Sequence, residues 1–497
     1  MKIVFALGAL LSVSACVVAQ RGPAASAVEP VADRLWVPQD VRLVSHEPPA
    51  VDTRVPPPFN DDGQTVNTVE PTVAQNHTDP GSVVDLVEVL SSAQTHDAEF
   101  QAAITNRSIT QRSTTIARSA FRPQISLGYV GGYYDFKSDS SEEYSGQQLS
   151  LTLSQSVYDR ANAIAVKQAE LAGASSDTQL QMAHEDLVIR VASRYFNVLK
   201  ALSELEYRQS DVKATKLQLE QTRSRYDVGS IAVTDVAEAK AQSDLAAAAE
   251  ITAKADLDAA LQALEVSTGQ SMSSNIAPLK HTIPMESPDP SDVDAWVQTA
   301  LENNKSLMVA RDQIDIAQQQ VSQTRASRLP VVSLTGYLSG IDSDYDAGED
   351  VSAEGYTGGS LRLGIDVPLS TGGRISAQIS QEQDRMQLAS DEMRTVERQV
   401  IQTTRDTYRA VVAAISRMAA LGQAVQSTQQ AIEATRSGFQ EGTRTSVDVL
   451  GSQRDTFRAQ TELTAARYDY VLQVLQLKRI SGTLELADIK RINEWLG

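Results

Sequence analysis

The segment QQLSLTLSQSV, residues 147–157, alternates apolar and small polar side chains over most of its length. Leucine stands at positions 149, 151 and 153, and serine or threonine stands at 150, 152 and 154. Because successive side chains of a strand point to opposite faces, the segment predicts a strand with one apolar and one polar face. Its length of about ten residues also suits a strand that crosses a membrane in a β-barrel.

The same alternation recurs at residues 123–136, 330–340 and 359–369, which gives two predicted hairpins. A half-buried sheet on a soluble core is the commoner source of one such strand, but four in an otherwise helical chain favour a transmembrane barrel. Four strands cannot close a barrel, and an open edge in lipid leaves unpaired backbone groups that cost several kcal/mol each. We therefore expect other copies of the chain to complete it. Three copies would supply twelve strands, although counting alone permits other multiples.

Each predicted hairpin is joined by an acidic segment, residues 137–146 and 341–358. The ligand spacing of a calcium-binding loop is absent from both. We therefore expect solvated loops at the outer end of the barrel, with a divalent-cation site in the acidic segments as the alternative.

Two long helices are predicted because residues 159–226 and 374–439 contain no proline and follow one hairpin each. Each helix would be roughly 100 Å long. Two shorter helices accompany each of them, at 97–121 and 234–268 in the first half and at 305–328 and 447–481 in the second. This order predicts two structural repeats, residues 81–285 and 286–497.

Two turns of the same frame end the long helices: RSRYDVGSIAVTDV at 223–236 and RSGFQEGTRTSVDV at 436–449. Gly229 and Gly442 are expected in the left-handed conformation that often ends a helix. Asp235 and Asp448 fall in the first turn of the returning helix, where a carboxylate is stabilised by the helix dipole. A role at a gate is the alternative for both aspartates.

The N-terminus predicts export from the cytoplasm. Residues 1–15 have the short apolar stretch and small residues of a signal peptide. Cys16, the only cysteine, follows them as in a bacterial lipobox and is a candidate for lipidation, with ordinary cleavage as the alternative. Residues 16–80 are rich in proline and lack an apolar period, so we expect a disordered tether there.

Composition argues against several classes of function. A formal charge of −19 with a pI near 4.8 would repel nucleic acid. The five histidines are scattered and none has a metal-ligand spacing. No catalytic arrangement or cofactor motif is present, so the chain is not expected to be an enzyme.

The two hairpins, the segments VPLSTGGRISAQI (367–379) and SQSVYDRANAIAVKQAELA (154–172), the two turns and the tail AARYDYVLQVLQLKRISGTLELADI (465–489) resemble the TolC-type outer-membrane efflux protein family. The resemblance implies a homotrimer in the outer membrane of a Gram-negative bacterium. It would be mainly α-helical, with a helical barrel in the periplasm and a twelve-stranded β-barrel in the membrane lipid. The implied function is passive export of substrate, together with a periplasmic adaptor (membrane fusion) protein and an inner-membrane transporter of the ABC or RND type.

The resemblance also implies functional residues. Arg444 and Asp448 match gate positions of the second turn, with Thr234 and Asp235 facing them from the first. Phe439 stands where a well-known member has Tyr, and Gly451 stands where it has an acidic residue, so this gate is expected to open more easily. Arg362 and Asp366 fall on the polar face of a strand that would line the barrel lumen.

Two questions stay open at this stage. A periplasmic adaptor or a structural coiled-coil lipoprotein would also be exported and helical, although the paired strands favour the channel. The sequence does not decide between type I protein secretion and efflux of small molecules.

Overall fold

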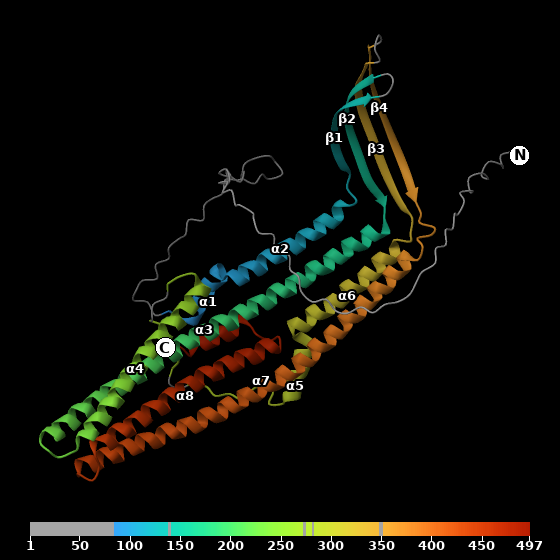
Figure 1. The fold of residues 1–497 in the computed structure, drawn as a ribbon. Helices are drawn as coiled ribbons and strands as arrows, with labels where there is room; N and C mark the ends of the chain where they lie inside the picture. Colours follow the sequence, from blue (N-terminus) through green and yellow to red (C-terminus); the bar gives the residue numbers. More distant parts are fainter. Residues whose placement is uncertain (1–83, 138–140, 272–274, 281–282, 347–350) are drawn as a thin grey trace, which may run out of the picture. The chain divides into compact units, whose positions relative to one another are not determined.

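The computed structural model describes residues 84–497 apart from 138–140, 272–274, 281–282 and 347–350 (Figure 1). The predicted signal peptide, Cys16 and the tether lie outside the described residues. Two similar runs of elements follow each other along the chain. The first is α1 (Leu86–His96), α2 (Ala98–Ser119), β1 (Gln124–Lys137), β2 (Ser141–Tyr158), α3 (Arg160–Asp227) and α4 (Val233–Thr268). The second is α5 (Val293–Asn303), α6 (Lys305–Ala326), β3 (Val331–Asp346), β4 (Val351–Asp366), α7 (Arg374–Gln440) and α8 (Ser446–Ile480), with α9 (Leu486–Glu494) after it.

The helices begin and end close to the predicted positions, and α3 and α7 contain 68 and 67 residues. The short helices α1, α5 and α9 were not predicted. Single residues separate α1 and α5 from the helices that follow them. Asp97 leaves the helical conformation and its carboxylate accepts the N–H of Phe100 at 3.0 Å, which starts α2 as a new helix. Asn304 caps α6 in the same way, by accepting the N–H of Leu307 at 3.1 Å.

The four strands form one antiparallel sheet in the order β1-β2-β3-β4 (Figure 1). β1 lies close to its predicted range, but β2, β3 and β4 extend well beyond theirs toward the hairpin ends, where Lys137 pairs with Ser141 and Asp346 pairs with Val351. The prediction that residues 137–146 and 341–358 are mainly loops is therefore wrong. A ladder joins backbone N–H and C=O groups, so it continues through polar sequence where no alternation signals it. At the other end β4 stops at Asp366, three residues before the predicted 369.

The register places the predicted apolar positions on one face of the sheet. Leu127, Leu151 and Leu338 lie side by side on β1, β2 and β3. Below them, toward the helices, Ile125 and Leu361 lie on the two outer strands. In a single chain this face is open, because Leu127 is 71% exposed and Leu361 is 72% exposed. The other face carries the serines and threonines, so the sheet is amphipathic across all four strands.

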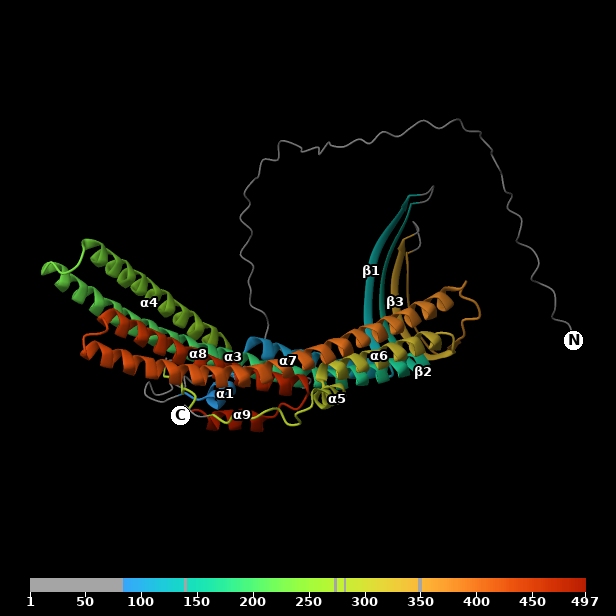
Figure 2. The same cartoon turned by 90° about the horizontal axis from the view of Figure 1, so that it is seen from below.

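The helices form two groups of four that follow each other end to end along the long helices α3 and α7 (Figures 1 and 2). Both groups contain α3 and α7. Next to the sheet the order is α2, α3, α6, α7, and next to the hairpin turns it is α4, α3, α8, α7. The outer helices leave large apolar side chains exposed, such as Ile116 on α2 (70%) and Leu245 on α4 (71%). Among the described residues, no helix has a stretch apolar and long enough to cross a membrane.

One hydrophobic core joins the two halves midway along the long helices. Tyr195 and Phe196 of α3 are fully buried in it, and the ring of Phe196 stacks on Tyr468 of α8 with 5.5 Å between centroids. The hydroxyl of Tyr195 donates to the carbonyl of Ala277 at 2.8 Å. Contact with this core fixes where α3 and α8 lie, and so positions the two helical hairpins that extend from it.

Candidate functional site

The first hairpin turn joins α3 to α4. Gly229 has a φ of +77°, and its N–H donates to the carbonyl of Tyr226 at 2.8 Å, while Ser230 N–H donates to the carbonyl of Arg225 at 2.9 Å. Only glycine adopts this left-handed backbone without strain. The returning helix has no side-chain cap, because its N-cap residue is Ala232. Thr234 and Asp235 lie exposed in its first turn.

The second turn joins α7 to α8 and is held more firmly. Gly442 has a φ of +75°, and the N–H of Thr443 donates to the carbonyl of Gly438 at 2.8 Å. Thr445 and Asp448 then form a capping box, in which the N–H of Thr445 donates to the carboxylate of Asp448 at 2.8 Å and the N–H of Asp448 donates to the hydroxyl of Thr445 at 3.2 Å. The pattern Thr-x-x-Asp could have revealed this box in the sequence, but Thr445 was not predicted.

The carboxylate of Asp448 is electrostatically stabilised at this tip. The backbone hydrogen bond from Thr445 lowers its pKa, and the side-chain hydrogen bond from Thr445 and the charge of Arg444 lower it further. A group with a lowered pKa stays charged at lower pH than usual. Asp448 thus stays negatively charged to lower pH than an ordinary aspartate, at the exposed tip of the second hairpin.

The predicted gate residues are not joined to one another within a single chain. Among the described residues, no hydrogen bond or ion pair links Arg444 or Asp448 to Thr234 or Asp235. Phe439 is 43% exposed on the last turn of α7. Asp235 instead lines a groove of about 390 Å³ between the two hairpins, opposite Gly451 and Arg454 of α8. A gate formed by these residues would therefore need contacts other than the hydrogen bonds and ion pairs found within one chain.

Ion pairs not predicted from the sequence join α3 of the first hairpin to α8 of the second. Near the tips, Nε of Arg454 lies 2.6 Å from Oδ1 of Asp211, whose side chain is only 4% exposed. The contact is off the N–H direction, so it is ionic rather than a directed hydrogen bond. Farther up the same seam, Arg479 pairs with Asp186 at 2.5 Å and Lys200 pairs with Asp469. No local pattern signals these pairs, because their members lie on different halves of the chain.

The two predicted lumen residues lie on the polar face of the sheet. Arg362 of β4 is opposite Thr335 of β3, and Asp366 is opposite Val331 at the end of the sheet next to the helices. Both side chains are exposed in the single chain. Their placement on this face follows from the alternation with Leu361 and Leu363.

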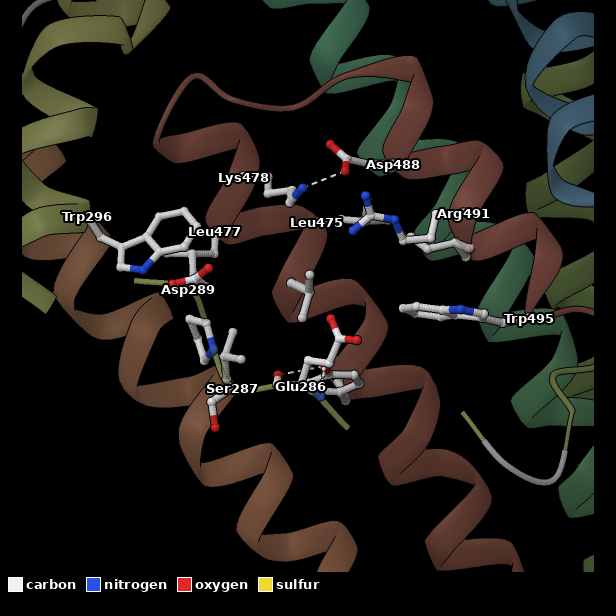
Figure 3. Close-up of a pocket in the computed structure, with 15 residues that line it drawn as sticks. Glu286, Ser287, Asp289, Trp296, Leu475, Leu477, Lys478, Asp488, Arg491 and Trp495 are labelled. Carbon is white, nitrogen blue, oxygen red and sulfur yellow. Dashed lines mark hydrogen bonds and ion pairs between the residues drawn. The ribbon is translucent and has the colours of Figure 1, made fainter. Parts of the chain in front are cut away.

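A pocket of about 180 Å³ lies beside the core, between residues 286–289, α8 and α9 (Figure 3). Two polar contacts in its lining join these segments. Tyr470 donates its hydroxyl hydrogen to the carbonyl of Glu286 at 3.0 Å, and Nζ of Lys478 lies 2.5 Å from Asp488. The lining contains no histidine or cysteine, and no nucleophile in it is paired with a base.

Metal binding finds no support in the described part of the chain, where no three His, Cys, Asp or Glu side chains are grouped to hold an ion. The features that call for a function are therefore the amphipathic sheet with two unpaired edges and the two hairpin tips.

Comparison with known proteins places these features in a family. The family model described as outer membrane efflux protein matches residues 89–270 and 296–483. Outer membrane protein TolC of Vibrio cholerae serotype O1 is 33% identical over 413 residues, which cover 83% of this chain and 94% of that protein. The alkaline protease secretion protein AprF of Pseudomonas aeruginosa is 26% identical, covering 80% of this chain and 84% of its own length.

A solved structure has the same fold. The outer membrane protein VceC from Vibrio cholerae superimposes with a TM-score of 0.62 at 21% sequence identity, over 80% of this chain and 96% of that one. The relatives are proteins of the outer membrane of Gram-negative bacteria, and this protein belongs to the same compartment. The chain belongs to the outer membrane efflux protein family and is a TolC-type efflux channel protein.

Proposed function

We propose that three copies of the chain assemble into one export duct, in which their sheets close into a twelve-stranded barrel across the outer membrane. The amphipathic sheet carries this proposal. Its apolar face is exposed in the single chain, and β1 and β4 each have only one neighbour within the described residues. An unpaired edge in lipid is costly, so β4 of one copy pairs with β1 of the next.

The helical layers support the same assembly. The outer helices α2 and α4 expose apolar side chains, including Ile251 of α4 at 72%. At the opposite edge α7 exposes Leu388 at 58%. Contact between the α2 and α4 edge of one copy and α7 of the next buries both sets. The helices then enclose a tunnel that continues the barrel through the periplasm.

Assembly stoichiometry tests this proposal directly. Native mass spectrometry of the detergent-extracted protein is expected to give one species of three chains. The β1 edge offers a check on the contact itself, because proline at a paired edge position removes a ladder hydrogen bond and should weaken the trimer. A stable single chain or a dimer in the outer membrane fraction would contradict the proposal.

The duct conducts passively and takes its energy from a partner. Its partners are a periplasmic adaptor (membrane fusion) protein, which contacts the helical tips, and an inner-membrane transporter of the ABC or RND type. The name of the relative AprF supports secretion of a protein as one candidate cargo. Small molecules are the other candidate, and the identity of the neighbouring transporter distinguishes the two.

The hairpin tips close the periplasmic end. In the trimer Arg444 and Asp448 of one copy face Thr234 and Asp235 of another, and an arginine–carboxylate contact between hairpins holds the tip shut. Phe439 cannot donate a hydrogen bond, and Gly451 brings no carboxylate, so fewer contacts hold this tip. Three Asp448 carboxylates then form the acidic constriction of the tunnel.

The lowered pKa of Asp448 predicts how the cation preference of the open duct depends on pH. The carboxylate is charged above its folded pKa, and the preference is lost only as the pH falls through that value. We expect the preference that disappears in Asp448→Ala to persist to lower pH than an ordinary aspartate carboxylate would allow. Reversal potentials measured from about pH 7 to about pH 3 for both proteins check this. Loss of the difference near pH 5 would show that the hydrogen bonds of Thr445 do not stabilise the charge.

An adaptor or a structural coiled-coil lipoprotein fits the observations less well. Neither of these proteins requires a four-stranded sheet with an exposed apolar face. The helical hairpins alone do not distinguish an adaptor, a structural lipoprotein and an export duct. If Cys16 is acylated, three lipid anchors, one from each copy, hold the trimer in the inner leaflet of the outer membrane. Acylation is compatible with the duct and is not evidence for the alternatives.

A further inference from the structure

Arg362 is a charged residue at the depth of the apolar band of the sheet. Its neighbours along β4, Leu361 and Leu363, are 72% and 63% exposed on the apolar face. Arg362 itself projects from the opposite face, at the level of Thr335 and Ser154. A guanidinium at membrane depth is costly unless it faces water, and such a residue commonly serves conduction.

No acidic side chain neutralises Arg362 at this level. Only two charged residues, Arg362 and Asp366, occur in the strand segments whose side chains the structure describes: residues 124–132, 146–158, 331–341 and 357–366. Asp366 is four residues away, roughly 13 Å along the strand, and Glu354 is eight residues away in the other direction, roughly 26 Å. Salt at physiological concentration screens charges beyond about 8 Å, whereas at about 10 mM salt Asp366 acts on the same ions as Arg362.

The edge strand of a neighbouring copy brings no carboxylate to this level either. Residues 124–132 of β1, which would pair with β4 in the closed barrel, read QISLGYVGG. The hydroxyl and glycine residues beside Arg362, namely Ser360 and Gly364 on its own strand, leave the guanidinium free to reach into the lumen. The hydroxyl of Thr335 donates to the backbone carbonyl of Arg362 at 3.5 Å, but among the described residues the guanidinium of Arg362 has no hydrogen-bond or ionic partner.

We propose that Arg362 is a specificity-determining residue of the barrel, which draws solutes bearing carboxylate, sulfate or phosphate groups into its lumen. Three copies form a ring of positive charge inside the membrane. The inference rests on the proposed trimeric duct. Within that duct its sign is opposite to that of the Asp448 ring at the periplasmic tip, and opposite to that of Asp366, which lies nearer the helices on the same face.

The test measures ion selectivity of the purified trimer in planar bilayers, as the reversal potential across a gradient of potassium chloride near 10 mM. At this concentration the screening length is about 30 Å, so a ring of charge acts across a wide lumen. Arg362→Gln is compared with wild type, and Asp366→Asn is the matched control on the same face of the same strand. Each is also made with Asp448→Ala, which removes the charge of the tip.

In the Asp448→Ala background, Arg362→Gln is expected to raise the permeability ratio of potassium to chloride by about threefold or more, and Arg362→Lys to leave it unchanged. Asp366→Asn is expected to change the ratio in the opposite direction. Unchanged selectivity in Arg362→Gln, with normal channel openings, would overturn the inference and leave the duct intact. Absence of any channel in the folded wild-type protein would instead overturn the proposed function, and this inference with it.

Discussion

Leu151→Arg is expected to abolish assembly of the trimer in the outer membrane. Leu151 lies in the middle of the apolar face, between Leu127 and Leu338. An arginine on the lipid face near the bilayer midplane costs about 2–4 kcal/mol, and a trimer carries it three times. The measurement is the amount of heat-resistant trimer in outer membrane fractions, seen by electrophoresis without boiling.

The matched control is Thr152→Arg, one residue along the same strand and on the polar face. There the new side chain reaches a water-filled lumen, so trimer is expected at close to the wild-type level, with altered ion selectivity. Equal loss of trimer in both variants would show that the two faces do not differ in solvent. Equal tolerance would show that the leucine face does not meet lipid.

Arg454→Ala is expected to destabilise the contact between the two helical hairpins by about 2–3 kcal/mol. The substitution leaves the carboxylate of Asp211, which is 4% exposed, without its cation. Removing one member of a fully buried pair costs about 3–5 kcal/mol. A smaller loss of about 2–3 kcal/mol is expected here because Arg454 is 41% exposed, so water already solvates part of the pair. Thermal unfolding followed by circular dichroism, together with protease sensitivity of the tips, measures the effect.

A double variant separates the loss of attraction from the burial of an unpaired charge. Asp211→Asn combined with Arg454→Gln removes both charges, and it is expected to be more stable than Arg454→Ala alone. A double variant less stable than the single one would show that the ion pair itself, rather than the stranded carboxylate, dominates. Arg458, which pairs with Glu462 of its own helix, provides a control: Arg458→Ala should have little effect.

The parts of the fold that were predictable from sequence are those with a local signal. Alternation around Leu151 identified a strand and its two faces, and the glycines at 229 and 442 located the hairpin turns. The extension of β2 back to Ser141 has no such signal, because the segment is polar and a backbone ladder with β1 needs no alternation of side chains.

Contacts between the two halves were beyond sequence reasoning. Asp211 and Arg454 are unremarkable charges on helices, and only the packing of α3 against α8 makes one of them buried and the other its partner. Asp448 shows the opposite case. Its place in the first helical turn was predicted, and the structure gives it a capping role with Thr445 that accounts for its position without any gate. Its role at the constriction stays a prediction.

Single-channel recording of the purified protein in planar bilayers tests the central claim most directly. The duct predicts discrete openings, which become larger or more frequent in Arg444→Ala because a contact that holds the tip shut is removed. Folded, membrane-inserted protein that gives no openings, in wild type and in Arg444→Ala alike, would contradict the account.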